Sequence, residues 1–282
     1  MTDWPQGIPR LTDYERSLAS PTFAAMAHFS REFAAAHGKS LRAFRRTWVS
    51  DPLWQWSRTW EYPFVFAHLQ QFAAGRQSFD LLDAGSGATF FPFFVARQLN
   101  ARVLCVDSDP RLDSPIRSIA QGTGLSVAAR IGDIRALDVR DGTVDAVVCI
   151  SVLEHTNRFR EIIAEFLRVL APGGLLVLTF DISPSGVTDI PPDAARDLFD
   201  AVTEATEPFG QASAKHESLD QALADLSHRL TTEWARRNRP SSLPWRWPAA
   251  SALKASMCRG RLATFIDLTC CCIARTKQAH RG

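Results

Sequence analysis

The sequence predicts an α/β protein built on a doubly wound, largely parallel sheet. Strand-like and helix-like segments alternate between residues 78 and 183, which is the order that such sheets require. Several of the strand-like segments are continuously apolar, as expected of strands that helices cover on both faces. A glycine-containing turn, "DAGSGAT", follows the first of them. In an open α/β sheet, a turn at this place borders the ligand crevice.

The elements of this region can be assigned in order. Strands are expected in "FDLLDAG", "ARVLCVDSD", "LSVAARIGDI", "VDAVVCISV" and "LLVLTFDIS", and helices in "TFFPFFVARQLN", "DPRLDSPIRSIAQGTG" and "RFREIIAEFLRVL". Thr89 is the candidate N-cap of the first helix. Pro92 fits the first turn of that helix, where no intrahelical donor is lost.

Four regions are expected along the chain. Phe23, Met26, Phe29 and Phe33 recur at helical spacing and predict an amphipathic helix. The regions are a helical cap (1–75), a ligand-binding core (76–183), an insertion that forms a lid (184–250) and the closing strands of the core (251–277). Within the last two, helices are expected near 192–206 and 217–237, then two strands, the second near 263–275.

Composition argues against several classes of protein. The net charge is +2 and no basic stripe is present, which disfavours nucleic acid as a partner. No CxxC pair occurs, so buried thiols are expected and no metal site. We expect a cytoplasmic location, because the N-terminal sequence lacks signal-peptide features and no apolar run reaches the roughly 20 residues of a membrane span. The cysteines are Cys105, Cys149, Cys258, Cys270, Cys271 and Cys272.

Polar residues and glycines follow the predicted strands, where the carboxyl ends of parallel strands meet at one edge of the sheet. Glycines after the first strand allow a sharp turn and a close approach of the backbone to a ligand. A nucleoside would suit the two carboxylates that follow: Asp107 would accept from both ribose hydroxyls and Asp133 from an adenine amine. Leu104 and Ile134 are candidates to flank the ring. The full set is Asp83, Gly85, Ser86, Gly87, Asp107, Ser108, Gly132, Asp133, Ile134, Ser151, Glu154, His155 and Asp181.

A dinucleotide is the first alternative ligand. Its fingerprint, GxGxxG, uses a third glycine for close packing of helix on strand. In "GSGATF" that position is Phe90, so a nicotinamide-dependent oxidoreductase is disfavoured.

Five segments between residues 81 and 180, "LLDAGSGAT", "VLCVDSD", "IGDI", "VDAVVCISVLEHT" and "RVLAPGGLLVLTF", together resemble the class I S-adenosylmethionine-dependent methyltransferases. "ATFIDLTCCCIART" resembles the last, antiparallel strand of that family. The resemblance implies a seven-stranded Rossmann-like sheet in the order 3-2-1-4-5-7-6, with strand 7 antiparallel. The family often has another glycine where this chain has Thr89.

The resemblance also implies roles for individual residues. The methionine end of S-adenosylmethionine would lie against the first turn and strand four, the ribose against the end of strand two, and the adenine against the end of strand three. In that order, the residues are Asp83, Gly85, Ser86 and Gly87 with Cys149, Ile150 and Ser151, then Asp107 and Ser108, then Asp133 and Ile134. Arg58 is a candidate for a bidentate contact with the cofactor carboxylate.

The predicted activity is in-line methyl transfer to a small-molecule acceptor. Trp48, Trp54, Trp56 and Trp60 suggest an apolar or planar acceptor, although aromatic residues of a helical cap can equally form its core. His155 is the candidate general base, which favours oxygen over nitrogen or carbon as the methyl-accepting atom. The alternative of another class is a noncatalytic binding or scaffold protein that retains the fold. The sequence does not indicate the oligomeric state.

Overall fold

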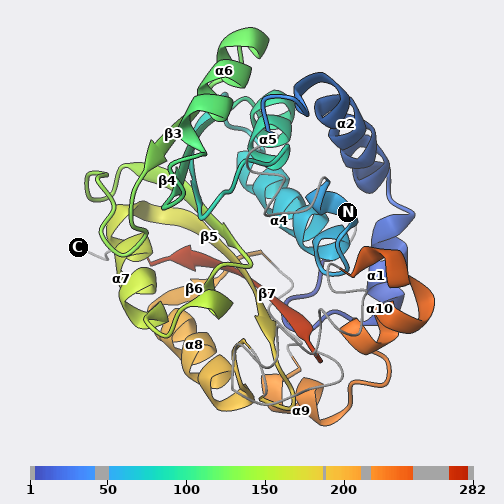
Figure 1. The fold of residues 1–282 in the computed structure, drawn as a ribbon. Coiled ribbons are helices and arrows are strands. Elements are labelled where there is room, and N and C mark those ends of the chain that lie inside the picture. The colour runs from blue at the N-terminus through green and yellow to red at the C-terminus, as the bar shows by residue number, and fades with distance from the viewer. Residues whose placement is uncertain (1–3, 42–50, 187–188, 211–216, 244–266, 279–282) are drawn as a thin grey trace.

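The computed structural model describes residues 4–41, 51–186, 189–210, 217–243 and 267–278. Its seven described strands form one sheet in the order β3-β2-β1-β4-β5-β7-β6 (Figure 1). The first five strands run parallel, and β7 pairs antiparallel with both β5 and β6. The predicted fold class and strand order are therefore confirmed. The strands are β1 (Phe79–Ala84), β2 (Ala101–Asp107), β3 (Val127–Ile131), β4 (Val144–Ile150), β5 (Leu170–Ile182), β6 (Thr206–Pro208) and β7 (Thr269–Lys277).

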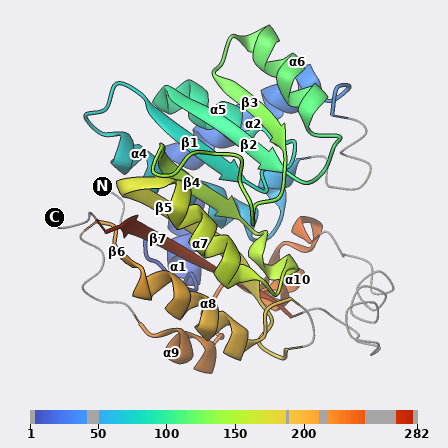
Figure 2. The ribbon, with the colours of Figure 1, turned by 90° about the vertical axis from the view of Figure 1, so that its left-hand side faces the viewer.

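Helices cover both faces of the sheet, which explains why its strands are apolar throughout. Alternate residues of one strand enter different cores: Leu81 packs with the helices of one face and Leu82 with those of the other. Figure 2 shows α7 and α8 on the face opposite α4 and α5. The core helices are α5 (Phe91–Leu99), α6 (Asp113–Thr123), α7 (Phe159–Val169) and α8 (Pro192–Glu204).

The N-terminal region adds α1 (Leu11–Leu18), α2 (Pro21–His37), the 3-10 turn η1 (Pro52–Trp54) and α4 (Arg58–Ala73). The apolar stripe on α2 is buried, as its spacing predicts. Ser20 caps that helix by accepting a 3.1 Å hydrogen bond from the N–H of Phe23. Helix α4 is buried on nearly every side, because it lies between the other N-terminal helices and the sheet and contacts β4, β5 and β7.

The insertion differs from its prediction. The helix expected near 192–206 is α8, but the one expected near 217–237 is two helices, α9 (Leu219–Ala224) and α10 (Thr232–Asn238). Each has its own N-cap, Ser218 and Thr231, whose side chain accepts from a backbone N–H of the first turn. The sixth strand of the expected order is the short β6 at Thr206–Pro208, whereas the sequence placed a strand before β7 among the closing residues 251–277. Strand β7 begins at Thr269, and residues 251–266, which include the first expected closing strand, lie outside the described residues.

The five described cysteines are buried free thiols, as expected, and Cys258 lies outside the described residues. Three of them lie on β7, where Cys270 and Cys272 pack into the core on one face of the sheet and Cys271 into the core on the other. Trp56 and Trp60 belong to the core, Trp54 is 37% exposed, and Trp48 is not described. Among the described helices, none is long and apolar enough to cross a bilayer.

Candidate active site

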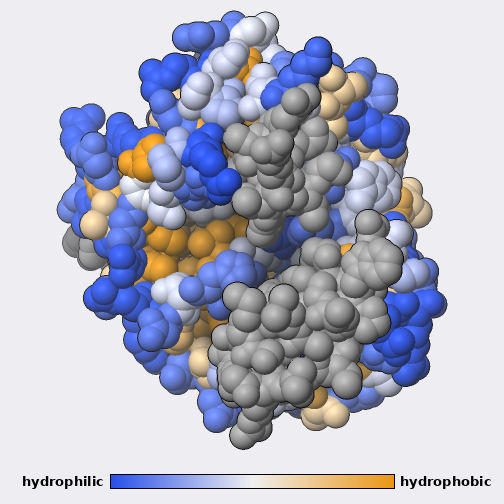
Figure 3. All heavy atoms as spheres, in the orientation of Figure 1, coloured by the Kyte–Doolittle hydropathy of each residue, from blue (hydrophilic) through white to orange (hydrophobic). Residues whose placement is uncertain are grey.

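A cavity of about 530 Å³ opens at the carboxyl ends of β1, β2, β3 and β4. Its walls contain the residues proposed from the sequence to contact the cofactor in the core, except Cys149 and Leu104, together with Arg58 and His155. The cavity is also lined by Tyr62, Thr89, Phe91, Asp109, Arg111 and Arg135. On the molecular face drawn in Figure 3, hydrophilic residues predominate and apolar side chains are visible in a central hollow.

The turn after β1 is held by backbone and side-chain hydrogen bonds. The N–H of Gly85 donates to the carbonyl of Val106 over 2.7 Å, and the N–H of Gly87 donates to Oδ2 of Asp107 over 2.9 Å. Both glycines have positive φ, +72° and +55°, a conformation that disfavours a side chain. The turn is thereby tied to the end of β2, and Asp107 is oriented beside it.

Two residues that follow this turn refine the sequence prediction. Thr89 is not the N-cap: helix α5 begins at Phe91, Phe90 is the cap, and Thr89 Oγ1 accepts only a long 3.4 Å contact from the N–H of Phe91. Phe90 is buried and packs against Phe29 and Tyr62. An aromatic core side chain therefore occupies the place of the third glycine of a dinucleotide fold, which argues further against that ligand.

Asp83 is the most perturbed acid of the cavity wall. Only 4% of the residue is exposed. Burial, and secondarily the charge of Asp107, raises the pKa of Asp83 to about 7. Asp107 also accepts a 2.9 Å hydrogen bond from the N–H of Asp109 through Oδ1. A carboxyl group titrating near neutrality in a cleft is typical of a functional site.

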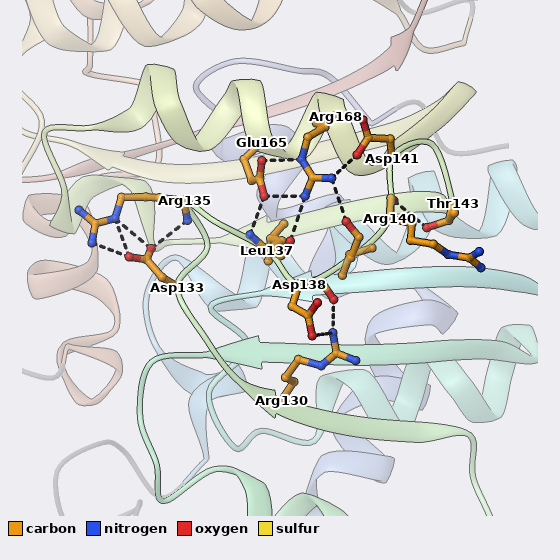
Figure 4. Close-up of polar contacts among 11 residues, drawn as sticks. Arg130, Asp133, Arg135, Leu137, Asp138, Arg140, Asp141, Thr143, Glu165 and Arg168 are labelled. Atoms are coloured by element: carbon orange, nitrogen blue, oxygen red, sulfur yellow. Dashed lines mark hydrogen bonds and ion pairs between the residues drawn. The ribbon is translucent and has the colours of Figure 1, made fainter.

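The connection between β3 and β4 carries Asp133 and is fixed by arginines (Figure 4). The guanidinium of Arg135 donates to both oxygens of Asp133, and these hydrogen bonds lower the pKa of that carboxyl to about 2. Further along, Arg168 of α7 donates to the carbonyl of Leu137 over 2.9 Å and forms a 2.7 Å ion pair with Glu165. The loop at the predicted adenine end is therefore anchored to α7.

Ser151 joins the sheet to the N-terminal cap. It follows β4 with a φ of +48°, an uncommon conformation for a residue other than glycine. Its hydroxyl donates to Oε1 of Glu61 over 2.8 Å, and Nη1 of Arg58 donates to both the Ser151 hydroxyl and Glu61. Glu61 was not predicted as a functional residue, although a charged pair three residues apart in an otherwise apolar helix is a signal for it.

Three other candidates occupy different positions. His155 ends the 3-10 turn η2 (Leu153–His155), its side chain is 56% exposed, and its Nδ1 lies 3.9 Å from Oδ1 of Asp189. Glu154 and Asp181 are buried and do not line the cavity. Burial, reinforced by the charge of Asp181, raises the pKa of Glu154 well above its usual value. Leu104 also lies outside the cavity wall.

Residues 82–178 match the family profile described as "Methyltransferase domain". The human thiol S-methyltransferase TMT1A is 34% identical over 39% of this chain and 46% of its own. The ubiquinone biosynthesis O-methyltransferase of Methylocella silvestris is 39% identical over 34% of this chain and 37% of its own. The norajmaline N-methyltransferase of Rauvolfia serpentina is 31% identical over 38% of this chain and 38% of its own. The chain thus spans less than half the length of these relatives.

A solved structure titled as a geranyl diphosphate methyltransferase in complex with SAM is 15% identical, with a TM-score of 0.55 over 97% of this chain and 98% of that one. This likeness extends the shared fold beyond the matched domain to the N-terminal helices. The predicted resemblance is confirmed by the domain match and the strand order together. Residues 82–178 thus match a methyltransferase domain, and they lie in a sheet with the strand order expected of the class I S-adenosylmethionine-dependent methyltransferases.

Proposed function

We propose that this protein transfers a methyl group from S-adenosylmethionine to a small-molecule acceptor. The observation that carries the proposal is the cavity at the carboxyl ends of the parallel strands, which joins the glycine turn to the carboxylates of Asp83, Asp107 and Asp133. Apart from Arg58 and Tyr62, all of its lining residues belong to the matched methyltransferase domain. The names of the relatives include S-, O- and N-methyltransferases. These names therefore do not favour sulfur, oxygen or nitrogen as the methyl-accepting atom.

The residues of the cavity fit the cofactor by their chemistry. Asp107, fixed by two backbone N–H groups, retains acceptor capacity for the ribose hydroxyls. Asp133 and Ile134 would contact adenine, while Ile150 and Ser151 would border the methionine portion. Arg58 lines the cavity. Its hydrogen bonds to Glu61 and Ser151 are both made by Nη1. Its remaining guanidinium nitrogens are the proposed contact for the cofactor carboxylate.

S-adenosylmethionine supplies a methyl carbon bonded to a good leaving group, so the chain has mainly to orient the acceptor and exclude water. Orientation contributes roughly 7–11 kcal/mol in favourable intramolecular reactions. We retain His155 as the general base and oxygen as the favoured accepting atom. His155 lines the cavity, and a positioned base contributes roughly 10²–10⁴-fold. A His155→Asn variant should then lose turnover while its affinity for S-adenosylhomocysteine stays the same.

The acceptor is proposed to be apolar or planar, and the protein to act in the cytoplasm. Both proposals rest on the sequence. Trp54, Trp56 and Trp60 do not line the described cavity. They would therefore influence the acceptor pocket only indirectly, through the packing of the cap. The proposed division into cap, core, lid and closing strands assigns the acceptor side to the cap and the lid.

Calorimetric titration with S-adenosylhomocysteine tests the cofactor site. The wild-type protein should bind, and Asp107→Ala should lose most of the affinity. Asp113→Ala is the matched control, because it removes an equally charged side chain that is paired with Arg117 at the surface. No binding by the wild-type protein at near-millimolar ligand would refute the proposal. Incubation of candidate acceptors with methyl-labelled cofactor then tests catalysis, and binding without any labelled product would favour the noncatalytic alternative.

A further inference from the structure

Arg58 and Glu61 form a buried ion pair at the start of α4. The exposed fractions of the two residues are 6% and 0%. Burial by itself would lower the pKa of Arg58, but the charges of neighbouring acids, chiefly Glu61, raise it above its usual value, so the guanidinium stays charged. A buried ion pair stabilises a fold little more than well-packed apolar side chains would. Packing alone therefore does not explain why a charged pair occupies this place.

The pair is tied to the sheet through Ser151. Nη1 of Arg58 donates to Oε2 of Glu61 and to the hydroxyl of Ser151. That hydroxyl donates in turn to Oε1 of Glu61 over 2.8 Å. The backbone N–H of Ser151 donates to the carbonyl of Thr179 over 2.9 Å, which fixes the serine to the sheet. Both carboxylate oxygens of Glu61 are thus engaged, and the three side chains form a closed ring of hydrogen bonds.

This ring uses only one nitrogen of the guanidinium. Arg58 lines the cavity, whereas Glu61 lies behind the wall. Within the described part of the chain, the hydrogen bonds of Arg58 all start from Nη1, the third being a 3.3 Å contact with Ser57. Nε and Nη2 are therefore the nitrogens that remain for an anion. One turn further along α4, Tyr62 also lines the cavity and stacks on Phe91 with the ring centroids 4.7 Å apart, which fixes this end of the helix against the core.

We propose that Glu61 is a positioning residue: by holding Nη1 of Arg58, it aims the remaining guanidinium nitrogens at the carboxylate of the bound cofactor. The inference rests on the proposed function, in which Arg58 makes that contact, and adds a residue that does not itself touch the ligand. A bidentate contact between a guanidinium and a carboxylate needs a fixed orientation as well as charge. Fixing the long arginine side chain before binding also lowers the entropy cost of binding. If Glu61 only offset the charge of Arg58, it would instead weaken the attraction for the cofactor carboxylate.

The experiment titrates the full chain with two probes in a calorimeter. S-adenosylhomocysteine carries the carboxylate, whereas decarboxylated S-adenosylhomocysteine keeps the nucleoside, the thioether and the ammonium but lacks it. We expect the wild type to bind the first probe at least about tenfold more tightly than the second. Glu61→Gln should reduce this preference at least about threefold, because a neutral amide holds the guanidinium less firmly. Glu204→Gln, the same change at an exposed position on α8, should leave the preference unchanged. A ratio of two affinities in one protein does not change when part of the sample is unfolded.

An unchanged or larger preference in Glu61→Gln would overturn the inference, since Glu61 would then only offset charge. Equal affinity of the wild type for both probes would overturn it as well and leave the nucleoside part of the cofactor site intact. Failure of the wild type to bind either probe would instead remove the proposed function. If Glu61→Gln does not fold, Ser151→Ala replaces it, because it removes the hydroxyl that joins Arg58 to Glu61. That variant should also lower the preference, and an unchanged ratio would count against the inference.

Discussion

A Cβ atom on Gly85 would lie 2.4 Å from Cγ2 of Val152. The turn after β1 and the segment after β4 therefore meet without room for a methyl group. This contact brings the glycine turn and Ser151 to the same wall of the cavity. Because the backbone of Gly85 also has a φ of +72°, the position excludes a side chain for two independent reasons.

Gly85→Ala should destabilise the protein and weaken cofactor binding. A non-glycine residue at positive φ costs roughly 1–2 kcal/mol, and an overpacked core side chain typically a further 1–3 kcal/mol. Urea unfolding measures the first effect and titration with S-adenosylhomocysteine the second. Gly122→Ala on α6 is the control, since a Cβ there meets nothing within 4 Å. If Gly85→Ala matched that control in both measurements, the contact with Val152 would be unimportant.

Affinity for S-adenosylhomocysteine should rise with pH up to about 7 and then level off. The ammonium of its amino-acid part prefers ionised Asp83, whose pKa is raised to about 7 by burial. Each pH unit below that pKa therefore costs up to about tenfold in affinity. Calorimetry across pH 5 to 8.5 would show this dependence. In Asp83→Asn it should disappear, and so should it for methylthioadenosine, which lacks the ammonium. A flat profile for the wild type would show that Asp83 does not face that group.

Glu154→Gln should change how stability depends on pH. The folded pKa of Glu154 lies above its unfolded value of 4.5, chiefly because of burial. The stability that the neutral acid contributes is thus complete below pH 4.5 and is lost as pH rises through the folded pKa. Glutamine never ionises, so the variant should gain on the wild type as pH increases. Thermal unfolding from pH 4 to 9 measures the difference, and parallel curves for the two proteins would contradict the expectation.

Ser20→Ala should destabilise the protein by about 1 kcal/mol, since the N-cap hydroxyl of α2 accepts from the N–H of Phe23. Ser20→Gly should cost only a few tenths of a kcal/mol. Chemical denaturation distinguishes the two variants. Equal losses would indicate that the hydroxyl does not act as a cap. Cofactor affinity should stay unchanged, because Ser20 lies outside the cavity wall.

The central sheet was predictable because its strands carry local signals: continuous apolar runs, followed by glycines and acids. The same signals placed Asp83, Asp107 and Asp133 at one edge, since parallel strands end there together. Glu61 escaped prediction because its role depends on contact with Ser151, 90 residues away. The position of strand β6 escaped prediction because three residues have no periodicity of their own, and pairing with β7 alone makes them a strand.

The place of β7 also bears on how the chain is made. Strand β5 is central in the finished sheet, yet its antiparallel neighbour is encoded by residues 269–277. During synthesis, β5 therefore emerges with one apolar edge unpaired, and an unpaired edge invites association with other chains. The segment at Gly7 exchanges two backbone hydrogen bonds with Cys272. It therefore cannot take its place beside the sheet until β7 has been synthesised. A newly made chain completes its sheet only after β7 has emerged from the ribosome, so nonsense mutations before residue 269 should yield aggregation-prone fragments.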